Sequence, residues 1–140
     1  MQSLAKSMCQ EWNLTHPHSV SPEDLLYFVY LDEFLDDWRR LYPSDGYEDA
    51  LSALEIAIMV SPTGPPVIPG TGGIRKLRFG PKKVGKSGGD RICYVYFPEH
   101  HIVMMMIAYP KSRKENLTSD EKKGMRQYVE EISRWLDSQS

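Results

Sequence analysis

The sequence predicts a small α+β protein in which helices pack on a twisted, mainly antiparallel sheet, in the order β-α-α-β-β-β-α. Apolar residues with helical spacing and short runs of β-branched and aromatic residues occupy separate stretches of the chain, and Gly and Pro clusters divide them. The length of 140 residues fits one domain. We therefore expect one compact unit with a single sheet.

The first regular segment is the apolar and aromatic run from Leu25 to Leu31, which is typical of a strand. Ser21, Pro22 and Glu23 also resemble a helix start, so a helix here is the alternative. Residues 1–24 are polar and interrupted by Pro and His. We expect them to form an N-terminal arm, part of which can be disordered, ahead of a single domain at 25–140.

Two helices are expected next. From Asp32 the spacing is helical until Pro43 and Gly46, and the apolar face comprises Phe34, Leu35, Trp38, Leu41 and Tyr42. A second helix is predicted from Tyr47 to Val60, and Pro62 follows it. Together they predict a helical hairpin.

Three strands and a last helix complete the chain. Ile74–Phe79, Arg91–Phe97 and Ile102–Tyr109 predict an antiparallel meander. Thr118 and Glu121 have capping-box spacing at the start of the last helix. We expect the helices to cover one side of the sheet and the other side to be exposed. Alternation places Lys76 and Arg78 on one face and Arg75 on the opposite face.

Positive charge is concentrated in one part of an acidic chain. Residues 1–60 carry 3 basic and 11 acidic groups, whereas residues 61–115 carry 10 basic and 3 acidic groups. The segment Ile68–Arg91 alone contains seven Lys or Arg residues and seven glycines. Such an asymmetry indicates a face that meets nucleic acid or phosphate.

The remaining composition predicts a cytoplasmic protein without cofactor, metal or membrane association. Cys9 and Cys93 are too few for a disulfide framework, and no apolar run has the length of a membrane span. Cys9, His16 and His18 have no established metal-site spacing. His100 and His101 fall in the expected turn between two strands, where surface positions are typical.

One motif imitates a nucleotide-binding loop. Residues 80–87, GPKKVGKS, fit the pattern G-x-x-x-x-G-K-[ST]. That loop requires a buried strand before it and a helix after it, because the helix N-terminus binds the phosphates. Here a charged strand precedes the motif and another strand is expected to follow it. We therefore reject nucleotide hydrolysis.

From about Tyr27 to Leu117 the chain resembles the HigB-type branch of the RelE/ParE family of toxins. The resemblance lies in IPGTGGIRKLRF, then GKSGGDRICYVYF, an apolar strand, and YPKSRKENLTSDEKK. It implies a RelE-like fold and a metal-independent endoribonuclease that enters the ribosomal A site and cleaves mRNA there. It also implies a helix-turn-helix antitoxin as partner, through which alone the protein would meet DNA.

In that chemistry the ribose 2'-hydroxyl attacks the adjacent phosphate, so the site needs a base, an acid and cations. A lysine crowded by other cations can accept a proton, and arginines stabilise phosphate charge. By position, the resemblance implies Lys76, Arg78 and Arg91 as catalytic residues. It implies RNA or phosphate contacts for Arg75, Lys82, Lys83, Lys86, Lys111 and Lys114, with Arg113 a less specific contact.

The chain departs from the family where better-known members use an Arg and a Tyr beyond the last strand, because Ser112 and the pair Leu117 and Thr118 stand there. The proton donor is therefore not assigned, and Tyr94 and Tyr96 are interpreted as packing residues. Two alternatives stay open. One is a gyrase-directed, ParE-like toxin, and the other is a non-catalytic module that binds RNA or a protein partner.

Overall fold

The computed structural model describes residues 22–43, 46–80, 89–113 and 116–139. Its order of helices and strands is the predicted one, with two added 3-10 turns. The elements are η1 (Pro22–Asp24), β1 (Tyr27–Tyr30), α2 (Asp32–Leu41), α3 (Tyr47–Val60), β2 (Ile74–Phe79), β3 (Asp90–Phe97), η3 (Pro98–His100), β4 (Ile102–Pro110) and α4 (Ser119–Ser138). The α+β class is confirmed.

The four strands form one sheet in the order β1-β4-β3-β2. β2 pairs with β3 and β3 with β4 in the antiparallel direction, while β1 joins the edge of β4 in parallel. The predicted meander and the mainly antiparallel character of the sheet are therefore confirmed. The parallel edge strand follows from the chain path, because α2 and α3 lie between β1 and the meander in sequence.

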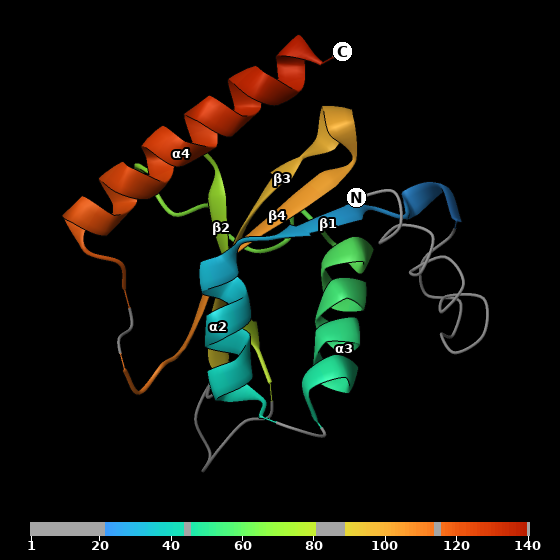
Figure 1. Ribbon diagram of the computed structural model, residues 1–140, viewed down its shortest axis with the longest axis vertical. Helices are drawn as coiled ribbons and strands as arrows, with labels where there is room; N and C mark the ends of the chain where they lie inside the picture. The colour runs from blue at the N-terminus through green and yellow to red at the C-terminus, as the bar shows by residue number, and fades with distance from the viewer. Residues whose placement is uncertain (1–21, 44–45, 81–88, 114–115, 140) are drawn as a thin grey trace.

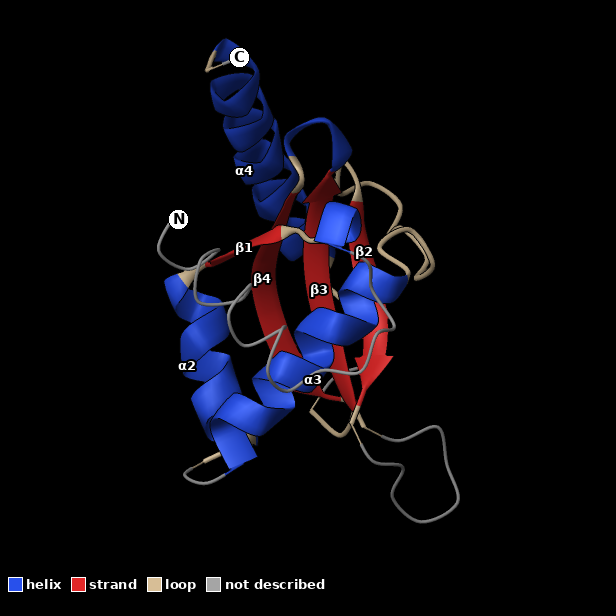
Figure 2. Ribbon diagram, turned by 90° about the vertical axis from the view of Figure 1, so that its right-hand side faces the viewer, coloured by secondary structure: helices blue, strands red, loops and turns tan. Residues whose placement is uncertain are grey.

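Helices cover both faces of the sheet, so the expectation of one covered and one exposed face is wrong. Figure 1 shows the sheet between α4 on one side and α2 with α3 on the other, and Figure 2 shows α3 crossing in front of the strands. The physical reason lies in the central strands. Residues of β3 and β4 are apolar at nearly every position, and strands of that kind are buried on both faces.

Each face has its own hydrophobic cluster. Under α2 and α3 the cluster includes Ile92, Tyr94 and Met105 from the sheet, together with Phe34 and Trp38. The rings of Phe34 and Trp38, four residues apart in α2, lie against one another with centroids 5.5 Å apart. The indole Nε1 of Trp38 also donates to the carbonyl of Tyr47 at 3.1 Å, which ties α2 to the start of α3.

The second cluster lies under α4. Val129 and Leu136 of that helix are buried together with Ile74, Cys93 and Met104 of the sheet. The helix begins with the predicted capping box, since the amide of Glu121 donates to Thr118 Oγ1 at 3.1 Å and the amide of Thr118 donates to Glu121 Oε1 at 2.8 Å. α4 therefore starts at a defined residue and crosses the face that carries Lys76 and Arg78.

The carboxylate of Asp37 accepts a hydrogen bond from the backbone of β4 beyond the point where β1 ends. Its Oδ2 accepts from the backbone N–H of Ala108 at 3.0 Å, and its Oδ1 accepts from Arg40 Nη2 at 2.6 Å. β1 pairs with β4 only as far as Met105, so Ala108 lies beyond the reach of that strand. Asp37 therefore supplies the acceptor that a longer β1 would have supplied.

Replacing Asp37 with alanine should lower the free energy of unfolding by about 2 to 3 kcal/mol, because a buried N–H loses its charged acceptor. Asp36 offers the matched control. It pairs with Arg39 at the same i,i+3 spacing, but its side chain is 64% exposed against 10% for Asp37. Asp36→Ala should cost at most about 0.5 kcal/mol. Urea unfolding of both variants checks this, and equal losses would contradict the buried role of Asp37.

The structure also bears on several other predictions. The residues after the nucleotide-loop imitation form β3, not a helix, as predicted. Cys93 and Met104–Met106 are buried. Residues 1–21, which include Cys9, His16, His18 and most of the expected N-terminal arm, lie outside the described residues.

Candidate nucleic-acid interface

Three basic residues predicted as catalytic lie on one face of the sheet, the face that α4 partly covers. Ile74 points into the cluster under α4, and strict alternation along β2 places Lys76 and Arg78 on that side. Cys93 belongs to the same cluster, so Arg91, two residues earlier in β3, shares this face. The structure therefore brings Lys76, Arg78 and Arg91 together; we call this surface the basic face.

Pairing between the strands fixes how these side chains lie. Arg78 is directly opposite Arg91, and Lys76 is directly opposite Cys93. Directly paired positions in an antiparallel sheet have Cβ atoms about 5 Å apart. Arg78 and Arg91 thus occupy directly neighbouring positions on adjacent strands.

The two arginines differ in exposure. Arg78 is exposed at the edge strand β2, whereas Arg91 is 0% exposed. A buried guanidinium has little freedom to move, because its position is set by the side chains packed around it. Arg91 therefore lies buried beneath the basic face, and Arg78 forms its accessible edge.

Tyr109 also lies on the basic face, next to Arg91, although simple alternation along β4 would not place it there. In β4 the register shifts opposite Cys93 and Tyr94, which pair with Ile107 and Met105, so Met106 is the extra residue of a β-bulge. Beyond the bulge the alternation reverses. Tyr109 consequently faces α4 and pairs directly with Arg91.

The connection from β4 to α4 borders the basic face. Lys76 Nζ donates to Asn116 Oδ1 at 3.2 Å, which links β2 to a residue forty positions later. Lys111 and Arg113 are exposed at the start of this connection. Lys114, like Lys82, Lys83 and Lys86 of the loop between β2 and β3, lies outside the described residues, so the predicted contacts of these four lysines stay predictions.

Arg75 does not join this group. It lies on the opposite face, and its Nη1 donates to the carbonyls of Thr63 and Pro65 at 2.9 and 2.7 Å. These bonds hold the connection between α3 and β2 against the sheet. Its predicted contact with RNA stays a prediction, but its described contacts are structural.

The turn that precedes β2 is built by Thr71 and the glycines around it. The hydroxyl of Thr71 donates to the carbonyl of Ile68 at 2.6 Å and accepts from the amide of Ile74 at 3.1 Å. Gly72 and Gly73 have φ angles of 77° and 118°, which favour glycine. The most specific part of the quoted motif therefore sets where β2 begins, and so which of its residues face α4.

Tyr94 is a packing residue, as predicted. It faces α2 and α3, is 0% exposed, and donates from its hydroxyl to the carbonyl of Pro62 at 2.8 Å. Burial raises the pKa of Tyr94 to about 12, although the nearby charge of Arg75 acts in the opposite direction. Burial and the neighbouring carboxylate of Asp90 likewise raise the pKa of Tyr42 to about 12.

These two tyrosines predict a loss of stability in strong base. An unfolded tyrosine loses its proton near pH 10, and the folded pKa of each is about 12, so the folded state holds its protons to higher pH. The stabilisation is present below about pH 10 and is lost as the pH rises towards 12. Urea unfolding at several pH values should show a shallower fall for Tyr94→Phe and Tyr42→Phe than for wild type. An unchanged fall in the double variant would contradict the two pKa values.

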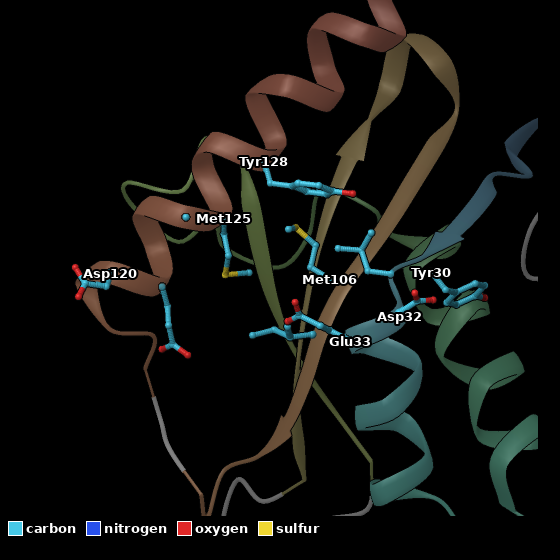
Figure 3. Close-up of a pocket in the computed structure, with 11 residues that line it drawn as sticks. Tyr30, Asp32, Glu33, Met106, Asp120, Met125 and Tyr128 are labelled. Atoms are coloured by element: carbon cyan, nitrogen blue, oxygen red, sulfur yellow. The ribbon is translucent and has the colours of Figure 1, made fainter.

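A different hollow lies on the acidic side of α4. A cavity of about 720 Å³ opens between the first half of α4 and the junction of β1 with α2 (Figure 3). Its apolar lining includes Met106 and Met125, and its four carboxylates are those of Asp32, Glu33, Asp120 and Glu121. Such a lining repels phosphate, so the candidate nucleic-acid interface is the basic face and not this cavity.

Within the described part of the chain, no helix combines the length and the apolar character needed to cross a membrane.

A small α+β fold with a basic sheet face is thus the class that the structure defines. No protein-family model matches the sequence. A mutant of the E. coli toxin RelE in the free state has a similar fold, with 20% sequence identity, a TM-score of 0.47, and coverage of 65% of this chain and 88% of that chain. The intact E. coli RelBE toxin-antitoxin complex also matches, with 20% identity, a TM-score of 0.46, and coverage of 61% and 95%. These likenesses concern the arrangement of helices and strands.

Proposed function

We propose that this chain is the toxin of a toxin-antitoxin system and acts as a ribosome-dependent mRNA endonuclease of the HigB type. The observation that carries the proposal is the grouping of Lys76, Arg78 and Arg91 on one face of the sheet. The quoted motifs reached the same three residues from the sequence alone. The pairing of Arg78 with Arg91 on neighbouring strands supports placing the proposed site on this surface.

The chemistry proposed for this face needs no metal ion. Lys76 lies at the rim of the site, where it takes the proton of the ribose 2'-hydroxyl. The oxygen then attacks the adjacent phosphorus to form a 2',3'-cyclic phosphate, and the bond to the 5' oxygen of the next nucleotide breaks as that oxygen takes a proton from water. Arg78 and Arg91 balance the negative charge that develops on the phosphate oxygens.

The burial of Arg91 strengthens this role. Electrostatic interactions are stronger where water is excluded, because the effective dielectric constant is lower. A guanidinium fixed beneath the basic face also requires no reorganisation when charge develops. Arg78, which is exposed, makes the first contact with the phosphate backbone.

The partners follow from the proposed function. The substrate is mRNA bound in the ribosomal A site, and the regulatory partner is a helix-turn-helix antitoxin encoded beside the toxin. The protein then works in the cytoplasm, where ribosomes are. A small helix-turn-helix reading frame next to this one would support the assignment.

The proposed mechanism is tested with purified protein and ribosomes that hold a short mRNA in the A site. Wild-type protein should cut the RNA and leave a cyclic phosphate or a 3'-phosphate on the upstream fragment. An mRNA with a single 2'-deoxy nucleotide at the cut position should stay intact, because its nucleophile is missing. Equal cleavage of both RNAs would contradict attack by the 2'-hydroxyl.

A further inference from the structure

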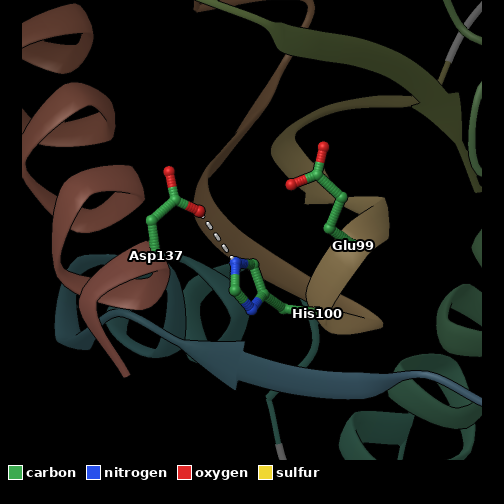
Figure 4. A group of neighbouring side chains, drawn as sticks. All are labelled: Glu99, His100 and Asp137. Atoms are coloured by element: carbon green, nitrogen blue, oxygen red, sulfur yellow. Dashed lines mark hydrogen bonds and ion pairs between the residues drawn. The ribbon is translucent and has the colours of Figure 1, made fainter. Parts of the chain in front are cut away.

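A second cluster of reactive side chains lies at the far end of α4. Glu99 and His100 belong to η3, the turn between β3 and β4, and Asp137 lies in the last turn of α4. Figure 4 shows the imidazole of His100 between the two carboxylates. One ligand atom from each residue lies within 4.8 Å of the other two, and His100 Nε2 is 3.1 Å from Asp137 Oδ1.

We propose that Glu99, His100 and Asp137 form a binding site for a divalent transition-metal ion, with Zn²⁺ as the best fit. One imidazole nitrogen and two carboxylate oxygens are ligands that zinc accepts, and a water molecule completes a tetrahedral site. The imidazole argues against Mg²⁺ and Ca²⁺, which take oxygen ligands.

The cluster needs little movement to bind an ion. Zinc lies about 2.0 to 2.2 Å from nitrogen and oxygen ligands, so ligand atoms around it are about 3.3 Å apart. His100 and Asp137 already have this separation. Glu99 is exposed on the turn, and rotation of its side chain brings the carboxylate closer.

Two features hold His100 and Asp137 in place before an ion binds. The side chain of His100 is only 17% exposed, so few rotamers are open to it. Leu136, the residue before Asp137, is buried in the cluster under α4, which fixes the end of the helix against the sheet. Ligands that are already positioned bind with a smaller loss of conformational entropy.

The electrostatics of α4 independently favour a cation here. The C-terminal end of a helix carries partial negative charge, and cations are stabilising there whereas carboxylates are not. The last turn of α4 contains no basic residue, yet Asp137 adds a carboxylate to it. A bound metal ion supplies the missing positive charge.

The site is separate from the basic face. Arg91 lies near the opposite end of β3 from the η3 turn, about 20 Å away along the strand at about 3.3 Å per residue. The metal ion would therefore act structurally, by fixing the end of α4 to the turn between β3 and β4. This inference is independent of the proposed ribonuclease function.

Isothermal titration of the full chain with ZnCl₂ tests the proposal. Wild-type protein should bind one equivalent, and His100→Ala and Asp137→Asn should each weaken binding by on the order of a hundredfold or more. His101→Ala is the matched control, because His101 is exposed in the same turn and is not part of the cluster. Its affinity should equal that of wild type.

Two further measurements separate this site from other sources of binding. A Cys9→Ser, His16→Ala, His18→Ala variant should bind zinc like wild type, since its substitutions lie in the arm. Zinc, but not Mg²⁺ at equal concentration, should raise the thermal unfolding midpoint of wild type and leave that of His100→Ala unchanged. Absence of zinc binding by wild type, or unchanged binding by His100→Ala, would overturn the proposal, as would loss of binding in the arm variant.

Discussion

Replacing Arg91 with methionine should lower ribosome-dependent RNA cleavage by on the order of a hundredfold or more, because a fixed positive charge at the developing phosphate charge is lost. Methionine is chosen over alanine since Arg91 is completely buried and truncation would leave a cavity. Cleavage of A-site mRNA by purified protein is the measurement, with the thermal unfolding midpoint measured beside it to confirm folding.

Arg39→Met provides the control for this substitution. Arg39 lies on α2, on the other side of the sheet from the basic face, and its side chain is 61% exposed. It should therefore retain wild-type cleavage. A folded Arg91→Met protein as active as Arg39→Met would exclude Arg91 from the site.

Replacing Lys76 with arginine should lower the rate of RNA cleavage about as much as Lys76→Ala does. The expected loss in each variant is about a hundredfold to ten-thousandfold. Arginine keeps the positive charge but does not give up its proton, so it cannot act as the base. The two variants are compared by single-turnover cleavage on the ribosome.

The comparison assigns a role to the lysine. Loss of activity in both variants supports proton transfer by Lys76. Activity in Lys76→Arg but not in Lys76→Ala would mean that Lys76 supplies charge alone. Wild-type rates in both would remove Lys76 from the mechanism.

Local signals predicted most of the fold. Proline and glycine positions set the ends of α2 and α3, and the capping box set the start of α4. Pairing of the last three strands followed from short connections. These features depend on neighbouring residues, so the sequence shows them directly.

Which face each residue occupies was harder to predict. The apolar run of β4 has no polar residue before its end to indicate a solvent side, so covering by helices on both faces was missed. Tyr109 was missed as a neighbour of Arg91 because the bulge at Met106 reverses the alternation. A one-residue bulge leaves no mark in such a run.

Contacts between distant segments were the least predictable. Arg75 is one residue from Lys76, yet its partners are carbonyls of a connection that the fold brings alongside it. His100 was interpreted as a surface residue of a turn. Its contact with Asp137 depends on where the end of α4 packs, which local sequence does not indicate. Asp37 and Ala108 likewise meet through the sheet edge. The two residues of each pair are far apart in the sequence, so no local pattern predicts their contact.

The central claim is that the basic face cleaves translated mRNA. It is tested most directly by mapping RNA 5' ends across the transcriptome after induction of wild type and of Lys76→Arg in growing cells. The account predicts new 5' ends in phase with codons of translated messages for wild type, and none for Lys76→Arg. Intact messages with double-strand DNA breaks would indicate a gyrase-directed toxin, and intact messages without breaks a binding module; either result would contradict the account.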